Sequence, residues 1–489
     1  MKKLLYLSVL ISLNSCIPKF KPPLIPNNQS FPLSYQFKDS LKDDSDNQSH
    51  TTSSLNASFK DTLPSYNEFF KDSLLVNLIN IAVKNNFDVQ MALQRMEYAK
   101  AEFSSAKGAM LPTVNGSAAF QQRKFGYYTM DDAGNRVTEF YPGFFIPTHL
   151  PDYYLGFVSN WEIDLWGKLK SRKKAAFLRF LESSEGKHLI VTGMVDQIAS
   201  YYYELLALDK ELELIRSSLS LQRNALEILK VQKEAGHATE LSIKQFEALV
   251  FNSKSIEVDC QKQIQLLENA INNLLGRYPE PIKRNSNFFN LDSLNIASTG
   301  VPAALLQNRP DIRGAELNLR AAKLNVKAAR AAFYPSFNIL GTLGFQAFNT
   351  QFLFNFPQSV AYNILGNLTG PLVNRSAIKA HFYKANAEQL ESLYRYQKTL
   401  LNAYLEVSSG LSSFKYLSDV EDLKTREAGA LDTSVKISND LFLNGKANYL
   451  EVLMAQKTAL QSNIDLIRIR KERFITNIHL YKSLGGGWR

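Results

Sequence analysis

Cysteine is almost absent from this chain of 489 residues, which has only Cys16 and Cys260. Cys260 lies within a helical pattern, and it is the only thiol left if Cys16 is modified. That leaves no pair for an intrachain disulfide, and neither cysteine belongs to a cluster with metal-ligand spacing. The sequence therefore predicts neither a disulfide framework nor a metal site.

Long apolar runs are also missing, apart from residues 4–13 near the amino terminus. A membrane-spanning helix needs about 20 apolar residues, so none is predicted in the mature chain. If this protein enters a membrane, it must do so with strands. The run at 4–13 is too short to span a bilayer and follows Lys2 and Lys3, which is the pattern of a removable signal.

The residue patterns of enzymes are missing as well. The six histidines lack metal-ligand spacing, and no glycine-rich phosphate loop follows a strand pattern. Arg309-Pro310-Asp311 could suggest chemistry, but a helix-starting turn with a buried Arg–Asp contact is the favoured interpretation. We predict no catalysis and no cofactor. The formal net charge of +10 is dispersed along helical faces, which favours a solvated surface over nucleic-acid binding.

What the amino terminus does contain is a lipoprotein pattern, because residues 13–16 read Leu-Asn-Ser-Cys and resemble a bacterial lipobox. We predict that residues 1–15 are a lipoprotein signal peptide and that Cys16 becomes an amino end acylated with fatty acids such as palmitate. Residues 16–72, with Pro-rich and Ser/Asn/Asp-rich stretches, are predicted to form a lipid-anchored tether. One lipid holds a protein only modestly, so a second membrane attachment is expected. The alternative is an ordinary signal with an incidental cysteine.

The second half of the chain repeats the first. A shift of about 223 positions places Pro112 on Pro335, and a shift of about 209 places Gly236 on Gly445. Two units of this size set the architecture. Three segments follow, namely a first repeat, an inter-repeat linker and a second repeat, at residues 73–276, 277–301 and 302–489.

Each repeat carries helices too long for a globular domain. No proline occurs between Trp166 and Tyr278, and apolar residues keep a seven-residue rhythm there. Residues 167–234 would span roughly 100 Å at about 1.5 Å per residue, and residues 376–443 match them in the second repeat. Such helices must be buried by one another and by neighbouring subunits, in a bundle or tube. A soluble coiled-coil scaffold would also fit the helices taken alone.

Two strands follow the shorter helix that opens each repeat. Apolar and polar residues alternate in four segments, at about 113–125, 153–165, 336–347 and 360–371. Each segment is long enough to cross an outer membrane when tilted, although alternation alone also suits a soluble sheet. Four strands leave two open edges, which lipid does not tolerate. We therefore predict a mainly α-helical protein with a membrane β part, in which three copies close a twelve-stranded barrel around an aqueous pore.

Three motifs stand in a fixed order along the chain. Residues 161–169 read Trp-Glu-Ile-Asp-Leu-Trp-Gly-Lys-Leu, residues 302–312 contain Pro-x-x-Leu-Leu-x-x-Arg-Pro-Asp-Ile, and residues 484–488 read Leu-Gly-Gly-Gly-Trp. Together they resemble the TolC-like outer-membrane efflux proteins, in their OprM/NodT-type lipoprotein branch. The resemblance extends over residues 74–488, nearly the whole mature chain.

The resemblance implies a homotrimer with a twelve-stranded β-barrel in the outer membrane and an α-helical tunnel in the periplasm. It also implies docking to a periplasmic membrane-fusion adaptor and an inner-membrane pump, commonly of the proton-driven resistance-nodulation-division (RND) class. The implied function is a passive conduit of a tripartite efflux system that exports small molecules such as drugs and toxic compounds. The alternatives are the duct of a type I protein secretion system and a non-transporting structural lipoprotein of the outer membrane.

In that family the tips of the helical hairpins close the tunnel and meet the adaptor. The implied adaptor-contact residues are Gly236, His237, Ala238, Asn444, Gly445 and Lys446. The implied gate candidates are Phe442, Glu451, Met454 and Ser242. Some relatives lock the gate with a charged pair that this chain lacks, so we expect closure by packing and by one ring of Glu451 carboxylates, which would attract cations. A solvated helix-face role is the alternative for Glu451.

Overall fold

The computed structural model describes residues 63–285, 308–370, 373 and 375–488. The predicted signal peptide, the acylation site Cys16 and most of the predicted tether lie outside the described residues, as does most of the predicted inter-repeat linker. The chain divides into two compact units. The strand unit comprises Glu97–Leu181 and Leu317–Tyr394 among the described residues, and the hairpin unit holds the described parts of Ile25–Met96, Glu182–Glu316 and Arg395–Arg489.

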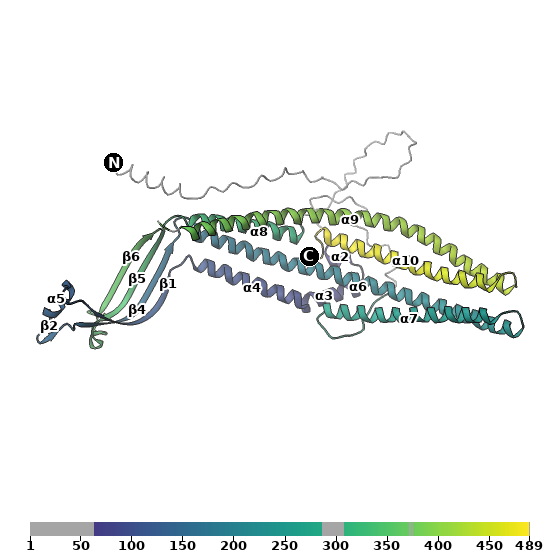
Figure 1. The fold of residues 1–489 in the computed structure, drawn as a ribbon, viewed down its shortest axis with the longest axis horizontal. Coiled ribbons are helices and arrows are strands. Elements are labelled where there is room, and N and C mark those ends of the chain that lie inside the picture. Colours follow the sequence, from purple (N-terminus) through teal and green to yellow (C-terminus); the bar gives the residue numbers. More distant parts are fainter. Residues whose placement is uncertain (1–62, 286–307, 371–372, 374, 489) are drawn as a thin grey trace, which may run out of the picture. The chain divides into compact units, whose positions relative to one another are not determined.

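The described chain is mainly helical, as predicted, and its two halves contain the same series of elements (Figure 1). Each half runs from a 22-residue helix through two sheet strands to a very long helix and a 35-residue helix. In the first half the helices are α4 (Phe87–Gly108), α6 (Lys168–Glu234) and α7 (Glu240–Leu274). In the second half they are α8 (Pro310–Ala331), α9 (Ser376–Leu443) and α10 (Tyr449–Ser483). Among the described residues, no helix has the length and apolar character needed to cross a membrane.

Local sequence explains where these helices begin and end. Pro310 is the first residue of α8, where its missing N–H removes no helical hydrogen bond. Pro112 and Pro335 follow the ends of α4 and α8 and precede strands, because proline fits poorly in a continuing helix. The long helices α6 and α9 end just before glycines with positive φ, Gly236 at 79° and Gly445 at 65°.

The strand unit contains a four-stranded antiparallel sheet in the order β1-β4-β5-β6. Its strands are β1 (Thr113–Lys124), β4 (His149–Ile163), β5 (Ser336–Ala347) and β6 (Val360–Thr369). The two strands from each repeat are paired with each other, and β4 joins β5 across the repeats. Strands β1 and β6 are therefore the open edges of this sheet.

A row of small residues crosses the sheet at right angles to the strands. Ser117 is opposite Gly156, Gly156 is opposite Gly344, and Gly344 is opposite Ala361. A Cβ atom on Gly156 would lie 2.5 Å from the Cα atom of Gly344. Glycine is thus required at this pair because the two backbones approach each other too closely for side chains. Figure 1 shows β1 and β4 curving along their length.

The connection between β1 and β4 is folded rather than a simple turn. It contains α5 (Met130–Val137) and a small hairpin of β2 (Glu139–Tyr141) and β3 (Phe144–Phe145). The ring of Phe140 lies 5.1 Å from that of Phe348 and 5.4 Å from that of Phe352, centroid to centroid. These contacts join the connection in the first repeat to the shorter connection between β5 and β6. Neither α5 nor the small hairpin was predicted from the sequence.

The main hydrophobic core lies in the hairpin unit, where α3 (Ser73–Asn85), α6, α7 and α10 contribute buried side chains. Tyr202 is fully buried there, and its hydroxyl donates a hydrogen bond of 2.5 Å to Asp72. Burial and the Asp72 carboxylate raise the pKa of Tyr202 above its usual value. The ring of Tyr481 stacks on Phe69 at 4.0 Å, and its hydroxyl donates to the carbonyl of Pro64. The core therefore fixes the described start of the chain onto the second repeat.

Candidate functional site

The tips of the two helical hairpins have the same backbone turn. In the first tip the amide of His237 donates to the carbonyl of Gln232 at 2.8 Å, and in the second the amide of Lys446 donates to Leu441 at 2.8 Å. This six-to-one bond around a glycine of positive φ satisfies carbonyls at the end of a helix. Of the six predicted adaptor-contact residues, Ala238 is partly buried and the other five are exposed.

Helices α7 and α10 begin at equivalent positions, after the capping residues Thr239 and Asn448. Ser242 and Glu451 both stand three residues after the cap. Ser242 is fully buried, and its hydroxyl donates a bond of 2.6 Å to the carbonyl of Thr239. Glu451 is exposed. At this equivalent position, the first repeat thus has a hydroxyl that is already hydrogen-bonded, and the second repeat has an exposed carboxylate.

A small hydrophobic cluster lies beneath the tips. Phe442 is partly buried against it, and Phe246 and Val452 are among its buried members. Met454 follows Glu451 by three residues and is 52% exposed, so the two side chains share one face of α10. Of the four predicted gate residues, Glu451 and Met454 are therefore exposed, whereas Phe442 is partly buried and Ser242 is fully buried.

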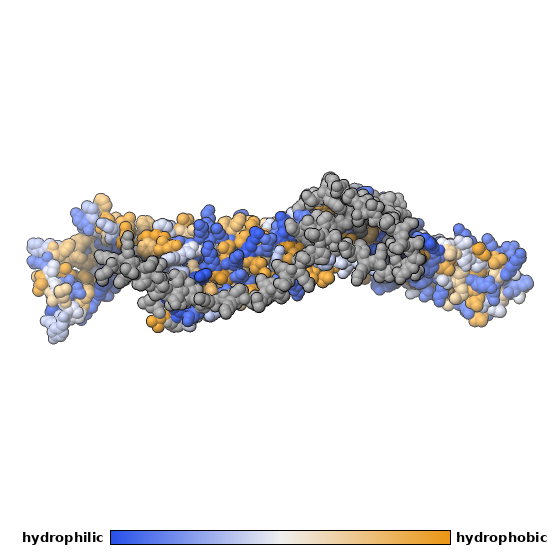
Figure 2. All heavy atoms as spheres, turned by 90° about the horizontal axis from the view of Figure 1, so that it is seen from above, coloured by the Kyte–Doolittle hydropathy of each residue, from blue (hydrophilic) through white to orange (hydrophobic). Residues whose placement is uncertain are grey.

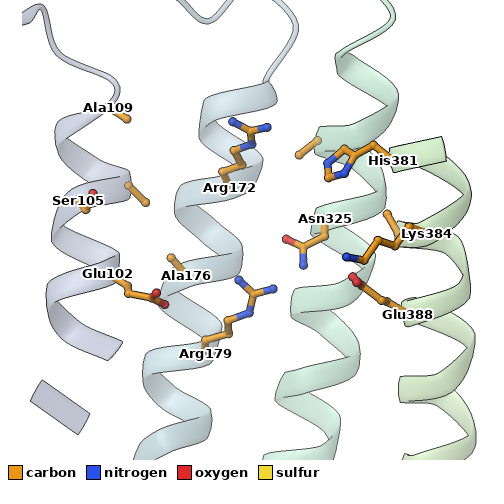
Figure 3. Close-up of a pocket in the computed structure, with 13 residues that line it drawn as sticks. Glu102, Ser105, Ala109, Arg172, Ala176, Arg179, Asn325, His381, Lys384 and Glu388 are labelled. Carbon is orange, nitrogen blue, oxygen red and sulfur yellow. The ribbon is translucent and has the colours of Figure 1, made fainter. Parts of the chain in front are cut away.

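A second feature, which the sequence analysis did not identify, is a polar cavity of 520 Å³ in the strand unit. It lies between α4, α6, α8 and α9, and Figure 3 shows charged side chains from α6 and α9 extending into one space. Its charged and titratable lining residues are Arg172, Arg179, His381, Lys384, Glu102 and Glu388. The side chains of Ala176, Ala328 and Ala385 are small and buried, which leaves the space between the helices open.

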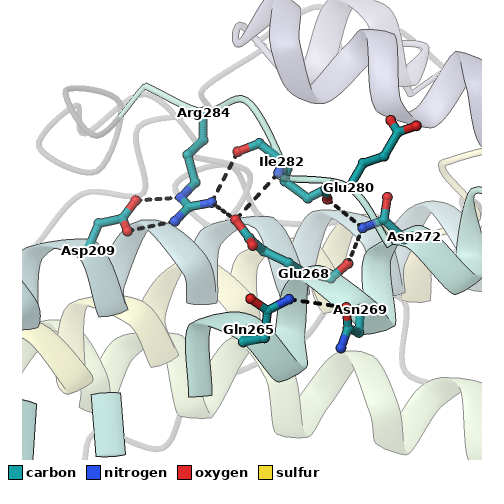
Figure 4. A network of polar contacts seen from close by, with 8 residues as sticks. All are labelled: Asp209, Gln265, Glu268, Asn269, Asn272, Glu280, Ile282 and Arg284. Carbon is teal, nitrogen blue, oxygen red and sulfur yellow. Dashed lines mark hydrogen bonds and ion pairs between the residues drawn. The ribbon is translucent and has the colours of Figure 1, made fainter. Parts of the chain in front are cut away.

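Arg284 fixes the start of the predicted linker to the first hairpin (Figure 4). Its guanidinium makes two hydrogen bonds to the carboxylate of Asp209 on α6, one of them 2.9 Å, and one to Glu268 on α7. The bonds to Asp209 and then Glu268 raise the pKa of Arg284 above its usual value. Asn272 donates to the carbonyl of Glu280 at 2.7 Å nearby. The network is structural, since every charge in it has a partner.

The Arg309-Pro310-Asp311 motif forms the expected helix-starting turn. Arg309 is 8% exposed and makes two bonds to Asp311, of 3.0 and 2.8 Å. It also donates to Glu406 on α9 at 2.7 Å and to the carbonyl of Ser483 on α10 at 2.8 Å. The predicted buried Arg–Asp contact is confirmed, and it joins the start of α8 to two other helices.

Cys260 is buried among apolar residues of α6, α7 and α10. Burial raises the pKa of its thiol to about 11, and the thiol donates to the carbonyl of Leu208. A thiol with so high a pKa is almost entirely protonated at neutral pH and is a poor nucleophile.

Two stretches of the chain, residues 78–277 and 301–486, match the family model described as outer membrane efflux protein. The chain belongs to the outer membrane efflux protein family. Both repeats are thus represented by a match, which extends over most of the chain. Outer membrane efflux proteins are channels rather than enzymes.

Named relatives agree with the family. The solvent efflux pump outer membrane protein SrpC of Pseudomonas putida is 26% identical over 489 residues, which cover 99% of this chain and 98% of SrpC. The probable outer membrane lipoprotein SilC of Salmonella typhimurium is 25% identical over 493 residues, covering 99% of each chain. A crystal structure of CusC shares the fold with a TM-score of 0.78 at 23% identity, covering 96% of this chain and 100% of CusC.

Sequence reasoning missed the polar cavity for a definable reason. Arg172 and Arg179 are seven residues apart, and His381, Lys384 and Glu388 follow one another at three- and four-residue steps. Each spacing places its residues on one helical face, and this signal was available. That the two faces meet depends on tertiary packing.

Proposed function

We propose that this protein is the outer-membrane duct of a tripartite efflux system and that it works as a homotrimer. The observation that carries the proposal is the four-stranded sheet with open edges at β1 and β6. An open edge exposes unpaired backbone groups, which cannot be left in lipid. Three copies would pair β1 of one chain with β6 of the next and close a twelve-stranded barrel, large enough for an aqueous lumen.

Exposed apolar side chains support the membrane location of the sheet. On β6, Tyr362, Ile364 and Leu368 are 77%, 76% and 61% exposed, and they alternate with Asn363 and Asn367. Large apolar residues so exposed are unfavourable in water and favourable against lipid. We assign this face of β6 to the lipid and the asparagine face to the lumen.

The helices also present apolar surface that a single copy leaves uncovered. Figure 2 shows apolar residues in patches among polar ones along the helical part. On α9, Tyr416, Val420 and Leu423 are exposed at four- and three-residue steps, which places them on one face. A second copy of the chain is the occupant that fits, because the closed barrel would bring neighbouring long helices together into a tunnel.

In this arrangement the hairpin tips form the periplasmic end of the duct. We propose that His237, Lys446 and the exposed residues beside them contact the membrane-fusion adaptor. Glu451 and Met454 then line the closed end, while Phe442 and Ser242 hold the tips in shape. Cys16 carries the lipid anchor on the periplasmic side, a proposal supported by the name of the relative SilC.

The exported molecules are proposed to be small solutes such as drugs and toxic compounds, with the energy supplied by an inner-membrane pump of the RND class. The names of SrpC, a solvent efflux protein, and CusC, from a cation efflux system, both refer to small exported species. Pull-down of the tagged protein from its native cells tests the pump class. Recovery of an ATP-driven exporter in place of a proton-driven pump would favour type I secretion.

The duct is tested by conductance of the purified full-length protein in a planar lipid bilayer, with its mass measured in detergent. We expect discrete channels and a trimeric mass. Ile364→Asp, which places a charge on the proposed lipid face, should prevent channel insertion. Tyr128→Asp is the matched control, since Tyr128 is 98% exposed and lies outside the strands. A monomeric protein without conductance would end the proposal.

A further inference from the structure

The cavity in the strand unit contains positive charge that the duct, the gate and the anchor do not account for. Arg172 and Arg179 lie two turns apart on one face of α6, roughly 10 Å along the helix axis. Lys384 extends toward the same space from α9 (Figure 3). Within the part of the chain that the structure describes, none of these three side chains has an ion pair or a hydrogen bond.

Cations on the other helical faces of this chain differ in whether they are paired. Lys230 pairs with Glu227 at 2.8 Å and Lys424 with Glu427 at 2.9 Å, whereas Lys170 and Lys174 on α6 have no ion pair within the described residues. What distinguishes the cavity is that three unpaired cations line one space, although two carboxylates line it too.

Those two carboxylates, Glu102 and Glu388, do not neutralise the cations. Neither forms an ion pair with Arg172, Arg179 or Lys384, and Glu102 accepts a hydrogen bond of 3.1 Å from Tyr98 instead. Three permanent positive charges therefore face two carboxylates, before any charge on His381 is counted. The donors that line the cavity include two guanidinium groups, one ammonium group, the side-chain amide of Asn325 and the hydroxyl of Ser105.

We propose that this cavity binds polyatomic anions through a phosphate or carboxylate group. Guanidinium groups match such oxygens two at a time, and an ammonium group adds a compact point charge. A volume of 520 Å³ is within the usual range for small-molecule sites. If the proposed duct is correct, the cavity is a binding station for anionic solutes on the helical wall. The binding site itself does not depend on that function.

Binding is tested by titration calorimetry of the full-length protein in detergent, at low ionic strength, with inorganic tripolyphosphate as the probe. We expect saturable binding to the wild type, and affinity at least about tenfold lower in the triple variant Arg172→Gln/Arg179→Gln/Lys384→Gln, because each charged contact is worth on the order of a factor of ten. The proposed site is contradicted if the wild type does not bind the probe, or if the triple variant binds it as strongly as the wild type.

The matched control is Lys170→Gln/Lys174→Gln/Lys379→Gln. It removes the same charge from the same two helices at exposed positions that do not line the cavity, so its affinity should equal that of the wild type. An equal loss in the control would mean that net charge attracts the probe and that the cavity does not. If the triple variant does not fold, the single variants Arg172→Gln and Arg179→Gln should each weaken binding.

A lipid headgroup could supply the same anionic oxygens as a soluble solute, and two arms distinguish these sources. The titration is repeated in nanodiscs of phosphatidylglycerol and of phosphatidylcholine. Equal affinities identify a soluble ligand, whereas weaker binding in phosphatidylglycerol identifies competition by a headgroup at the same site. Either result supports the anion site, provided that the triple variant weakens the binding as expected.

The bilayer recording separates this inference from the proposed function. A wild-type protein that binds tripolyphosphate but forms no channel contradicts the duct and leaves the anion site standing. A protein that conducts but does not bind the probe contradicts the site alone. If the wild-type protein both conducts and binds the probe, tripolyphosphate should reduce its channel current. The reduction should be much smaller in the triple variant.

Discussion

At the scale of single residues, the two repeats differ where their backbones are most alike. The tips share a turn, a glycine and a capping position, yet Ser242 is bonded internally whereas Glu451 is exposed at the equivalent place. Duplicated frameworks allow such divergence, because the cap and the turn fix the backbone and leave the third position free. We therefore propose that the gate lies at the second tip.

Replacing Glu451 tests that assignment. Glu451→Ala should raise the closed-state conductance several-fold, since a ring of carboxylates at the narrow end would be removed, and it should make cells more sensitive to drugs. Single-channel recording measures the first effect and growth inhibition the second. Glu472→Ala, at another exposed position on α10, is the control and should change neither. Unchanged conductance in Glu451→Ala would leave Glu451 as an ordinary solvated residue.

At the scale of elements, Arg309 connects three helices through one side chain. Arg309→Ala would leave the carboxylate of Asp311 and the carbonyl of Ser483 without a shared donor, in a largely buried setting. We expect the free energy of unfolding to fall by about 2–3 kcal/mol. Arg313→Ala, which removes a long ion pair of 3.7 Å from a more exposed side chain, should change it by less than about 1 kcal/mol. Thermal denaturation in detergent, followed by circular dichroism, compares the two.

The sheet gives a second prediction at this scale. In Gly344→Ala the new methyl group would meet the Leu155 carbonyl oxygen at 2.5 Å and the Gly156 Cα atom at 2.6 Å. Both contacts are backbone, so the strands must separate, and overpacking of this kind costs about 1–3 kcal/mol. We expect less assembled protein in outer-membrane fractions, measured by heat-modifiable migration on gels. Gly116→Ala has no atom within 4 Å of its new Cβ and should assemble normally.

Periodicity predicted the long helices and the positions of the strands, because the seven-residue rhythm and the two-residue alternation each extend over many residues. It did not predict α5 or the β2–β3 hairpin, which are short and depend on aromatic contacts such as that between Phe140 and Phe348. Strand β4 begins at His149, four residues before the predicted segment. Pro151 lies near the beginning of β4, where proline is tolerated.

The sites also divide into those that local sequence predicts and those that depend on tertiary packing. The glycine-centred tips follow from local sequence, whereas the anion cavity and the Arg284 network depend on faces that only packing brings together. Within the tips, exposure could not be read from the sequence. Nothing in the spacing of Ser242 and Glu451 indicates that one side chain turns inward and the other does not.

At the scale of the whole molecule, two attachments to the membrane are proposed, an acyl chain on Cys16 and a shared barrel. They differ greatly in strength, because a single acyl chain gives only reversible binding while a barrel buries many apolar side chains. Loss of the lipid should therefore leave the protein in the outer membrane. This separation of effects makes the anchor testable without destroying the channel.

Cys16→Ser should abolish labelling by radioactive palmitate in growing cells, yet the protein should still fractionate with the outer membrane and conduct in bilayers. Cys260→Ser is the control and should keep its label, since the buried thiol of Cys260 is not expected to be acylated. Label that persists in Cys16→Ser would show that the lipobox interpretation is wrong. Release of the unlabelled protein into the soluble fraction would instead mean that the acyl chain is the main attachment, which would contradict the barrel.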